Sequence, residues 1–141
     1  RGERCDIDGR GLGFTQRPPA KPLIAAVEGY ALAGGTEVAL SCDLIVASRE
    51  SAFGIPEVKR SLVAAGGGVF RLPRMLPRNV AWELGLTGDP ISAQRAYDLG
   101  FVNRIAEPGT ALETALELAA QFPARHDRFL DAPVFGRSSS R

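Results

Sequence analysis

Two kinds of hydrophobic pattern alternate along the chain, and their order predicts an α/β fold. Residues 22–30 and 44–48 are nearly continuous apolar runs, which are typical of strands buried on both faces of a parallel sheet. Residues 35–42 lie between them and are expected to form a short helix. Residues 52–55 are expected to form a third strand that ends at Pro56. The first half therefore predicts a strand–helix–strand unit.

The second half is predicted to consist of short helices with clear start and stop signals. The pattern indicates helices over residues 66–75, 79–86 and 93–99. Gly88 and Gly100 follow two of these helices as stop signals, and Ser92 precedes the third as a cap. Residues 101–105 are expected to form a final strand.

The last helix is predicted to begin after Thr110, because Thr110-Ala111-Leu112-Glu113 has the spacing of a capping box. One face of this helix carries apolar residues at 3.6-residue spacing and is expected to dock on the domain: Leu112, Ala115, Leu116 and Ala119. Residues 1–20 and 123–141 show neither the two-residue period of a strand nor the 3.6-residue period of a helix. We therefore expect an irregular lead-in, a core over residues 21–122 and an irregular tail.

Composition excludes several classes of partner. Seventeen basic and sixteen acidic side chains among 141 residues leave a formal charge of +1, so neither nucleic acid nor a membrane surface is expected as a partner. Cys5, Cys42 and His126 form no ligand cluster, so no metal is expected. No apolar run approaches the roughly 20 residues that span a bilayer. We expect a cytoplasmic protein in which Cys42 is a small core residue.

The turn at Ala33-Gly34-Gly35 is the strongest candidate for chemistry, because it joins an apolar strand to a helix N-terminus. Unpaired N–H groups at such a terminus stabilise an anion. Glu37 follows within one helical turn, and Glu57 follows the strand expected over residues 52–55. Ligands collect where strands end and helices begin, so both carboxylates are candidates for one crevice, with acid and base duties divided between them. Alternatively, Glu37 is ordinary first-turn helix decoration and Glu57 a solvated loop residue.

Other candidates have plainer interpretations. Gly66-Gly67-Gly68 matches neither G-x-G-x-x-G nor a P-loop, so a tight packing contact or active-site wall is favoured over a phosphate cradle. Arg71, Arg74 and Arg78 have no aromatic residues interleaved as a nucleic-acid platform, which favours solvated helix ends. Trp82 is expected to fill a core or a helix interface.

An ordered series of motifs resembles one known family. The series runs from Lys21-Pro22-Leu23-Ile24-Ala25-Ala26-Val27-Glu28-Gly29-Tyr30-Ala31-Leu32-Ala33-Gly34-Gly35-Thr36-Glu37 through Cys42-Asp43, Phe53-Gly54-Ile55-Pro56-Glu57, Ala65-Gly66-Gly67-Gly68, Leu86-Thr87-Gly88-Asp89-Pro90-Ile91-Ser92-Ala93 and Gly100-Phe101-Val102. It resembles the crotonase family of enoyl-CoA hydratases and isomerases. The resemblance implies a spiral of strand–strand–helix turns, here partial. It also implies acyl-CoA thioester substrates, no separate cofactor because coenzyme A is part of the substrate, and trimers or dimers of trimers.

The resemblance also implies roles for three residues. Gly34 matches a backbone N–H donor of the family's oxyanion hole. Glu37 and Glu57 match two glutamates that hold and activate water in hydratases, with Glu37 as base and Glu57 as acid. The implied reaction is addition of water to 2-trans-enoyl-CoA in fatty-acid β-oxidation or related acyl-CoA catabolism. Family members that only shift a double bond often keep one acidic residue, so the pair favours a hydratase over an isomerase.

The sequence departs from the family in three places, and the first departure indicates a fragment that lacks the N-terminal part. The family's first oxyanion donor lies upstream of the region that Lys21 opens, and nothing in residues 1–20 matches it. Val69 stands where hydratases often have a threonine after the glycine run, and residues 123–141 do not resemble the family's C-terminal helices. Arg1 in place of methionine also indicates a processed or shortened start. A non-catalytic remnant or association module is therefore the alternative to a hydratase.

Overall fold

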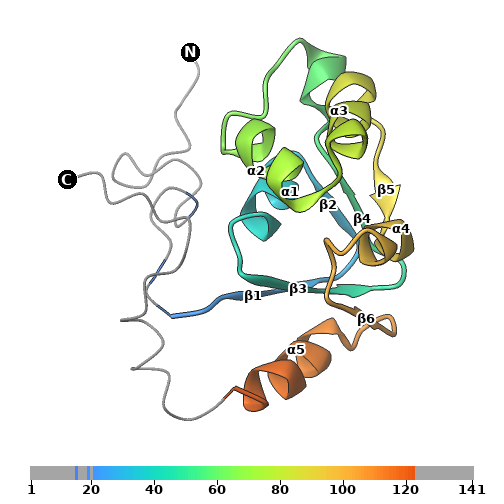
Figure 1. Cartoon of the computed structure of the whole chain (residues 1–141). Coiled ribbons are helices and arrows are strands. Elements are labelled where there is room, and N and C mark those ends of the chain that lie inside the picture. Colours follow the sequence, from blue (N-terminus) through green and yellow to red (C-terminus); the bar gives the residue numbers. More distant parts are fainter. Residues whose placement is uncertain (1–14, 16–18, 20, 123–141) are drawn as a thin grey trace, which may run out of the picture.

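The computed structural model describes Thr15, Pro19 and residues 21–122, which form two small sheets with helices around them (Figure 1). The first sheet has the order β1-β3-β6 and is wholly parallel; its strands are Ile24–Val27, Leu44–Ser48 and Arg104–Ala106. The second has the order β2-β4-β5, with strands Tyr30–Leu32, Ala52–Gly54 and Ile91–Ser92, of which β5 is antiparallel. Apart from Thr15 and Pro19, the expected lead-in and tail lie outside the described residues, and so do Cys5 and His126.

The helices follow the predicted start and stop signals, and one further helix is present. They are α1 (Gly34–Ala39), the 3-10 helix η2 (Pro56–Arg60), α2 (Gly68–Met75), α3 (Arg78–Thr87), α4 (Ala93–Asp98) and α5 (Ala111–Ala120). The predicted cap of α4 is confirmed, because the Arg95 N–H donates to Ser92 Oγ at 3.2 Å. Gly88 ends α3 with a φ of 67°, as predicted. The sequence pattern did not predict η2.

The prediction of one strand over residues 22–30 is wrong. Gly29 adopts a φ of 72°, which L residues rarely tolerate, and this bend divides the run into β1 and β2. The two strands pair with different sheets: Ile24 aligns with Leu44, whereas Tyr30 aligns with Ala52. Each pair of successive strands, β1–β2 and then β3–β4, thus passes from the first sheet to the second.

Strand β3 is buried on both faces, as predicted from its apolar run. Ile45 and Ala47 belong to the main core, whereas Val46 packs in a second cluster with Ala111 and Ala115 of α5. This alternation follows from the two-residue period of a strand. Figure 1 shows α5 on one side of β1 and β3 and the other helices on the opposite side.

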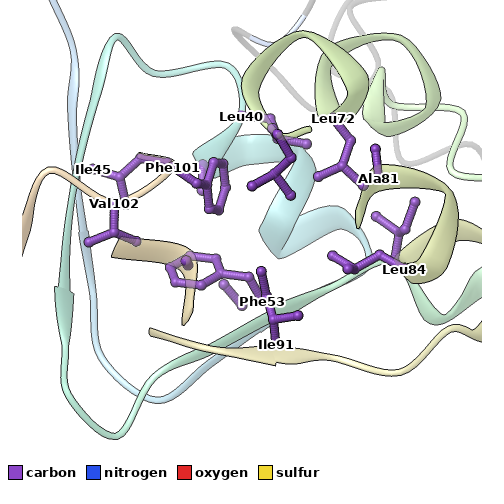
Figure 2. Packing of buried hydrophobic residues seen from close by; sticks show 14 of the residues in the cluster. Leu40, Ile45, Phe53, Leu72, Ala81, Leu84, Ile91, Phe101 and Val102 are labelled. Carbon is purple, nitrogen blue, oxygen red and sulfur yellow. The ribbon is translucent and has the colours of Figure 1, made fainter. Parts of the chain in front are cut away.

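The main core fills the space between the two sheets and helices α1 to α4. Phe53 of β4 and Phe101 meet edge to face there, with ring centroids 5.1 Å apart and planes at 87°. Figure 2 shows these rings among apolar side chains that come from several strands and helices, including Leu40, Ile45, Leu72, Ala81, Leu84, Ile91 and Val102. This core fixes α1 and α2 relative to the ends of β2 and β4.

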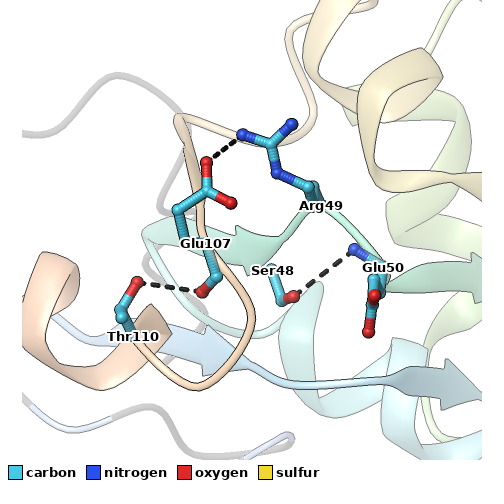
Figure 3. A network of polar contacts seen from close by, with 5 residues as sticks. All are labelled: Ser48, Arg49, Glu50, Glu107 and Thr110. Carbon is cyan, nitrogen blue, oxygen red and sulfur yellow. Dashed lines mark hydrogen bonds and ion pairs between the residues drawn. The ribbon is translucent and has the colours of Figure 1, made fainter.

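The predicted capping box of α5 is wrong. Thr110 Oγ1 donates to the Glu107 carbonyl at 2.9 Å instead of capping the helix, and Glu107 also pairs with Arg49 (Figure 3). The cap comes from Glu28, whose carboxylate accepts the N–H groups of Ala111 at 2.9 Å and Gly109 at 3.2 Å. These hydrogen bonds, that from Ala111 first, lower the pKa of Glu28.

The docking face predicted for α5 is only partly right. Ala115 is buried with Ala111, but Leu112 and Leu116 are 64% and 62% exposed. The helix packs on the sheet through Ala111 and Ala115, with half-buried Leu118 beside them.

Cys42 is half-buried and is not part of the main core cluster. Its Sγ donates to the Val38 carbonyl at 3.5 Å, and burial, with the charge of Asp43, raises the pKa of the thiol. Within the described part of the chain, no helix has the length and apolar content to cross a membrane. Histidine, cysteine and carboxylate side chains likewise form no group of three suited to a metal ion among these residues.

Candidate active site

The turn from β2 into α1 has an unusual backbone. Ala33 has φ 52° and ψ −123°, a conformation that alanine rarely adopts, and its N–H donates to the Gly54 carbonyl at 2.9 Å. Gly34 follows as the first residue of α1, where a helix offers its N–H group no acceptor of its own. Backbone strain of this kind is concentrated at functional sites, because the surrounding structure must hold it in place.

Thr36 holds this turn against both strands. Its hydroxyl is fully buried, contacts the carbonyls of Ala31 and Gly54 and accepts the Gly54 N–H at 3.0 Å. The side chain thereby joins α1 to the ends of β2 and β4. Sequence reasoning missed Thr36, because a threonine in a first helical turn carries no signal that distinguishes it from an ordinary helix residue.

Glu37 is buried in the first turn of α1, with 4% of its surface exposed. Its Oε1 accepts the N–H of Gly68, the first residue of α2, at 2.9 Å. A β-carbon on Gly68 would lie 3.1 Å from this oxygen and 3.0 Å from Ala64 Cβ. The prediction of a tight packing contact at the glycine run is therefore confirmed at Gly68. Glu37 does lie in the first turn of its helix, but it is buried and hydrogen-bonded to another helix, so it is more than helix decoration.

Glu57 lies in the first turn of η2, directly after β4 and Pro56. Its Oε2 is buried and has no hydrogen-bond partner among the described residues. An unpaired buried carboxylate oxygen is costly, and such groups in native structures call for a functional explanation. The interpretation of Glu57 as a solvated loop residue is wrong for this oxygen.

A cavity of about 510 Å³ lies beside Glu57. Glu57 and Gly68 both line it, and Glu37 lies behind Gly68, to whose N–H it is hydrogen-bonded. Neither Glu37 nor Gly34 is itself a lining residue. The remaining wall is mostly apolar and comes from η2, α2, α3 and the segment between η2 and α2: Ile55, Val58, Leu62, Val63, Ala64, Val69, Leu72, Pro73, Arg78, Ala81, Trp82, Gly85 and Leu86.

Two further predictions for this region need correction. Trp82 does not fill a core: it is 53% exposed and lines the cavity. Arg71 is not a solvated helix end, because its guanidinium donates to the carbonyls of Thr15 and Gly66, the latter at 3.1 Å. Arg74 and Arg78 are exposed, as expected.

The paired sheets and the successive strand–strand–helix turns are those of a crotonase-type fold. A family model described as enoyl-CoA hydratase/isomerase matches residues 17–131, and the chain belongs to this family. Mevalonyl-coenzyme A hydratase sidH of Aspergillus fumigatus is 42% identical over 120 residues, which are 84% of this chain and 44% of that protein. Carnitinyl-CoA dehydratase of Salmonella typhi is 46% identical over 101 residues, which are 72% of this chain and 39% of that protein.

Solved structures agree with this assignment. An enoyl-CoA hydratase from Mycobacterium tuberculosis H37Rv superposes with a TM-score of 0.82 at 68% identity, over 85% of this chain and 48% of that one. Enoyl-CoA hydratase EchA1 from Mycobacterium marinum gives a TM-score of 0.79 at 70% identity, over 81% of this chain and 45% of that one. The chain spans less than half the length of each of these relatives, so its fold is a partial crotonase fold.

Proposed function

We propose that this site adds water to 2-trans-enoyl-CoA thioesters in fatty-acid or related acyl-CoA catabolism. The observation that carries the proposal is the buried Oε2 of Glu57, which has no hydrogen-bond partner within the described part of the chain. It lies at a cavity that Gly68 also lines, and the Gly68 N–H is hydrogen-bonded to Glu37. Hydration needs one group that takes a proton from water and one that gives a proton to carbon. Two carboxylates with different surroundings suit these two tasks.

Glu37 is the proposed base. The Gly68 N–H donates to its Oε1 at 2.9 Å, which fixes the orientation of the side chain. As the water oxygen bonds to the β-carbon of the substrate, Glu37 accepts the proton that the water loses. Burial of Glu37 restricts its side chain, so little reorganisation is needed at the moment of reaction.

Glu57 is the proposed acid. Addition to the β-carbon moves electron density from the double bond towards the thioester, and a protonated Glu57 then gives its proton to the α-carbon. Transfer of the proton from Glu37 to Glu57 through solvent restores both groups, so the net change is addition of one water.

Gly34 is the proposed donor to the thioester oxygen, which gains negative charge before the α-carbon is protonated. Its place as the first residue of α1 supports this role, because the helix offers that N–H no acceptor. The loss of one donor of this kind typically costs about 2.7–4 kcal/mol of transition-state stabilisation. The family resemblance implies that the companion donor lies upstream of Lys21.

The direct test measures loss of the conjugated thioester absorbance of a short enoyl-CoA. Glu37→Gln and Glu57→Gln should each lower kcat by about 10²–10⁴-fold, the usual contribution of general acid–base catalysis. Glu117→Gln, an exposed glutamate on α5, is the matched control and should leave the rate unchanged. A wild-type rate no higher than that of the Glu37→Gln, Glu57→Gln variant would refute the proposal for this chain.

Exposed leucines on α5 favour a second candidate, association with other chains. Leu112 and Leu116 present apolar surface on the side of α5 that does not pack on the sheet. The proposal for the whole protein is a trimer or a dimer of trimers in the cytoplasm. Sedimentation measures the number of chains in the assembly.

Product analysis separates a hydratase, which forms a 3-hydroxyacyl-CoA, from an isomerase, which forms an enoyl-CoA with a shifted double bond.

A further inference from the structure

The hydroxyl of Thr36 lies where the turn into α1 meets β2 and the end of β4. The residue has no exposed surface. A threonine hydroxyl can donate one hydrogen bond and accept others through its lone pairs. Here it contacts the carbonyls of Ala31 and Gly54, the latter at 2.9 Å, and accepts the Gly54 N–H at 3.0 Å. These partners are all backbone groups, so the side chain fixes the course of the chain itself.

The strained conformation of Ala33 depends on one of the same carbonyls. Ala33 has φ 52° and ψ −123°, and its N–H donates to the Gly54 oxygen that the Thr36 hydroxyl also contacts. A residue keeps such a conformation only where its surroundings hold it. Gly34 comes next in the chain, so the direction of its N–H depends on these hydrogen bonds.

Gly54 also begins the short segment that leads to Glu57. Only Ile55 and Pro56 separate the two residues, and Pro56 is the first residue of η2. Ile55 is buried in the main core. A β-carbon on Gly54 would lie 3.0 Å from Pro90 Cα, so the end of β4 is closely packed. Because the segment is short and packed, the place of Glu57 depends on the place of Gly54.

We propose that Thr36 is a positioning residue, whose hydroxyl sets both the direction of the Gly34 N–H and the place of Glu57. The inference rests on the proposed function, which assigns the thioester oxygen to Gly34 and the proton donor to Glu57. Thr36 acts through these groups and not on the substrate. A misplacement of about 1 Å in such groups can lower a rate by about 10²-fold.

The substitution Thr36→Val keeps the branched shape of the side chain and removes the hydroxyl. With a short enoyl-CoA as substrate, kcat should fall by about 10²-fold, because the reacting groups are misplaced. KM should change by less than about threefold, because the lost contact affects groups that act mainly in the transition state. Thr36→Ser restores a hydroxyl and should keep kcat within about threefold of wild type.

Ser51→Ala is the matched control for loss of a buried hydroxyl. Ser51 is 2% exposed and precedes β4 at the end opposite Gly54, and its Oγ donates to the Val27 carbonyl at 3.0 Å. This substitution should lower stability, but it should leave kcat and KM unchanged, because Ser51 has no contact with the turn into α1. Circular dichroism verifies that each variant keeps its fold.

Amide hydrogen exchange gives a readout that does not depend on catalysis. In Thr36→Val, the amides of Ala33 and Gly54 should exchange about tenfold faster or more relative to those of Ile45 and Val46 in β3, because a buried hydrogen-bond partner is lost. Thr36→Ser should leave these ratios close to the wild-type values.

A folded Thr36→Val variant with the wild-type kcat would overturn the positioning role, and so would a Thr36→Ser variant as slow as Thr36→Val. An equal loss of kcat in Ser51→Ala would overturn it as well, because the effect would then follow from lost stability. If wild type does not hydrate the substrate while exchange at Ala33 and Gly54 rises only in Thr36→Val, the proposed reaction is wrong for this chain and the role of Thr36 in fixing the turn stands.

Discussion

The two sides of this molecule differ in how completely their groups are paired. On the side of α5, the strand β3 is fully covered, the helix N-terminus is capped by Glu28, and alanines pack closely on the sheet. On the cavity side, Ala33 is strained, Glu57 Oε2 has no hydrogen-bond partner among the described residues, and Trp82 lies half exposed. Strain and unpaired polar groups persist only where the surrounding packing tolerates them. The comparison is consistent with the proposed function, in which the α5 side stabilises the fold and the proposed chemistry lies on the other side.

The largest expected change comes from the core that supports both sides. Phe53→Ala removes a fully buried ring that packs against Phe101 and should lower the free energy of unfolding by about 3–5 kcal/mol. Urea unfolding followed by circular dichroism measures the change. A loss below about 1 kcal/mol would mean that the two sides do not depend on this ring pair.

A smaller change separates two glycines of the cavity wall. Gly68→Ala brings a β-carbon within 3.1 Å of Glu37 Oε1 and should cost about 1–3 kcal/mol of stability by overpacking. It should also lower kcat with little change in KM, because Glu37 is displaced. Gly85→Ala is the matched variant and should raise stability by about 0.5–1 kcal/mol. Equal effects of the two substitutions on unfolding would contradict the described packing.

The smallest change concerns the cap of α5. Glu28 has a pKa lowered by hydrogen bonds from Ala111 and Gly109, so its contribution to stability is present above the usual glutamate pKa and is lost as pH falls through the lowered value. Glu28→Gln should therefore be less stable than wild type at neutral pH, and the difference should narrow in acid. Thermal unfolding of both proteins at neutral pH and in acid measures this difference in stability. A difference that does not change with pH would contradict the role of the Glu28 carboxylate as a cap.

The elements with local signals were predictable from the sequence. The apolar run of β3, the Ser92 cap and the Gly88 stop depend on neighbouring residues only, and each is where the sequence places it. The division of residues 22–30 at Gly29 was not predictable, because an apolar run does not show which sheet each half joins. The cap from Glu28 joins residues 83 positions apart, so the local Thr110 motif was misleading.

The sequence suggests candidate residues for the site but not the contacts between them. Adjacent glycines and two glutamates after strands identify Gly34, Glu37 and Glu57 as candidates. Their relation depends on long-range packing: Gly68 meets Glu37 across 31 residues of sequence. Trp82 was expected in a core or a helix interface, because large aromatic residues are usually buried, whereas here the residue is 53% exposed and lines the cavity.

The double substitution Glu37→Gln, Glu57→Gln tests most directly whether the two carboxylates act as one unit. If they serve the same hydration step, each single substitution removes most of the rate, and the double variant should be little slower than the slower single variant. The measurement is kcat for a short enoyl-CoA in wild type, both single variants and the double variant. Losses that multiply in the double variant would show that the two glutamates act independently and would contradict the shared site.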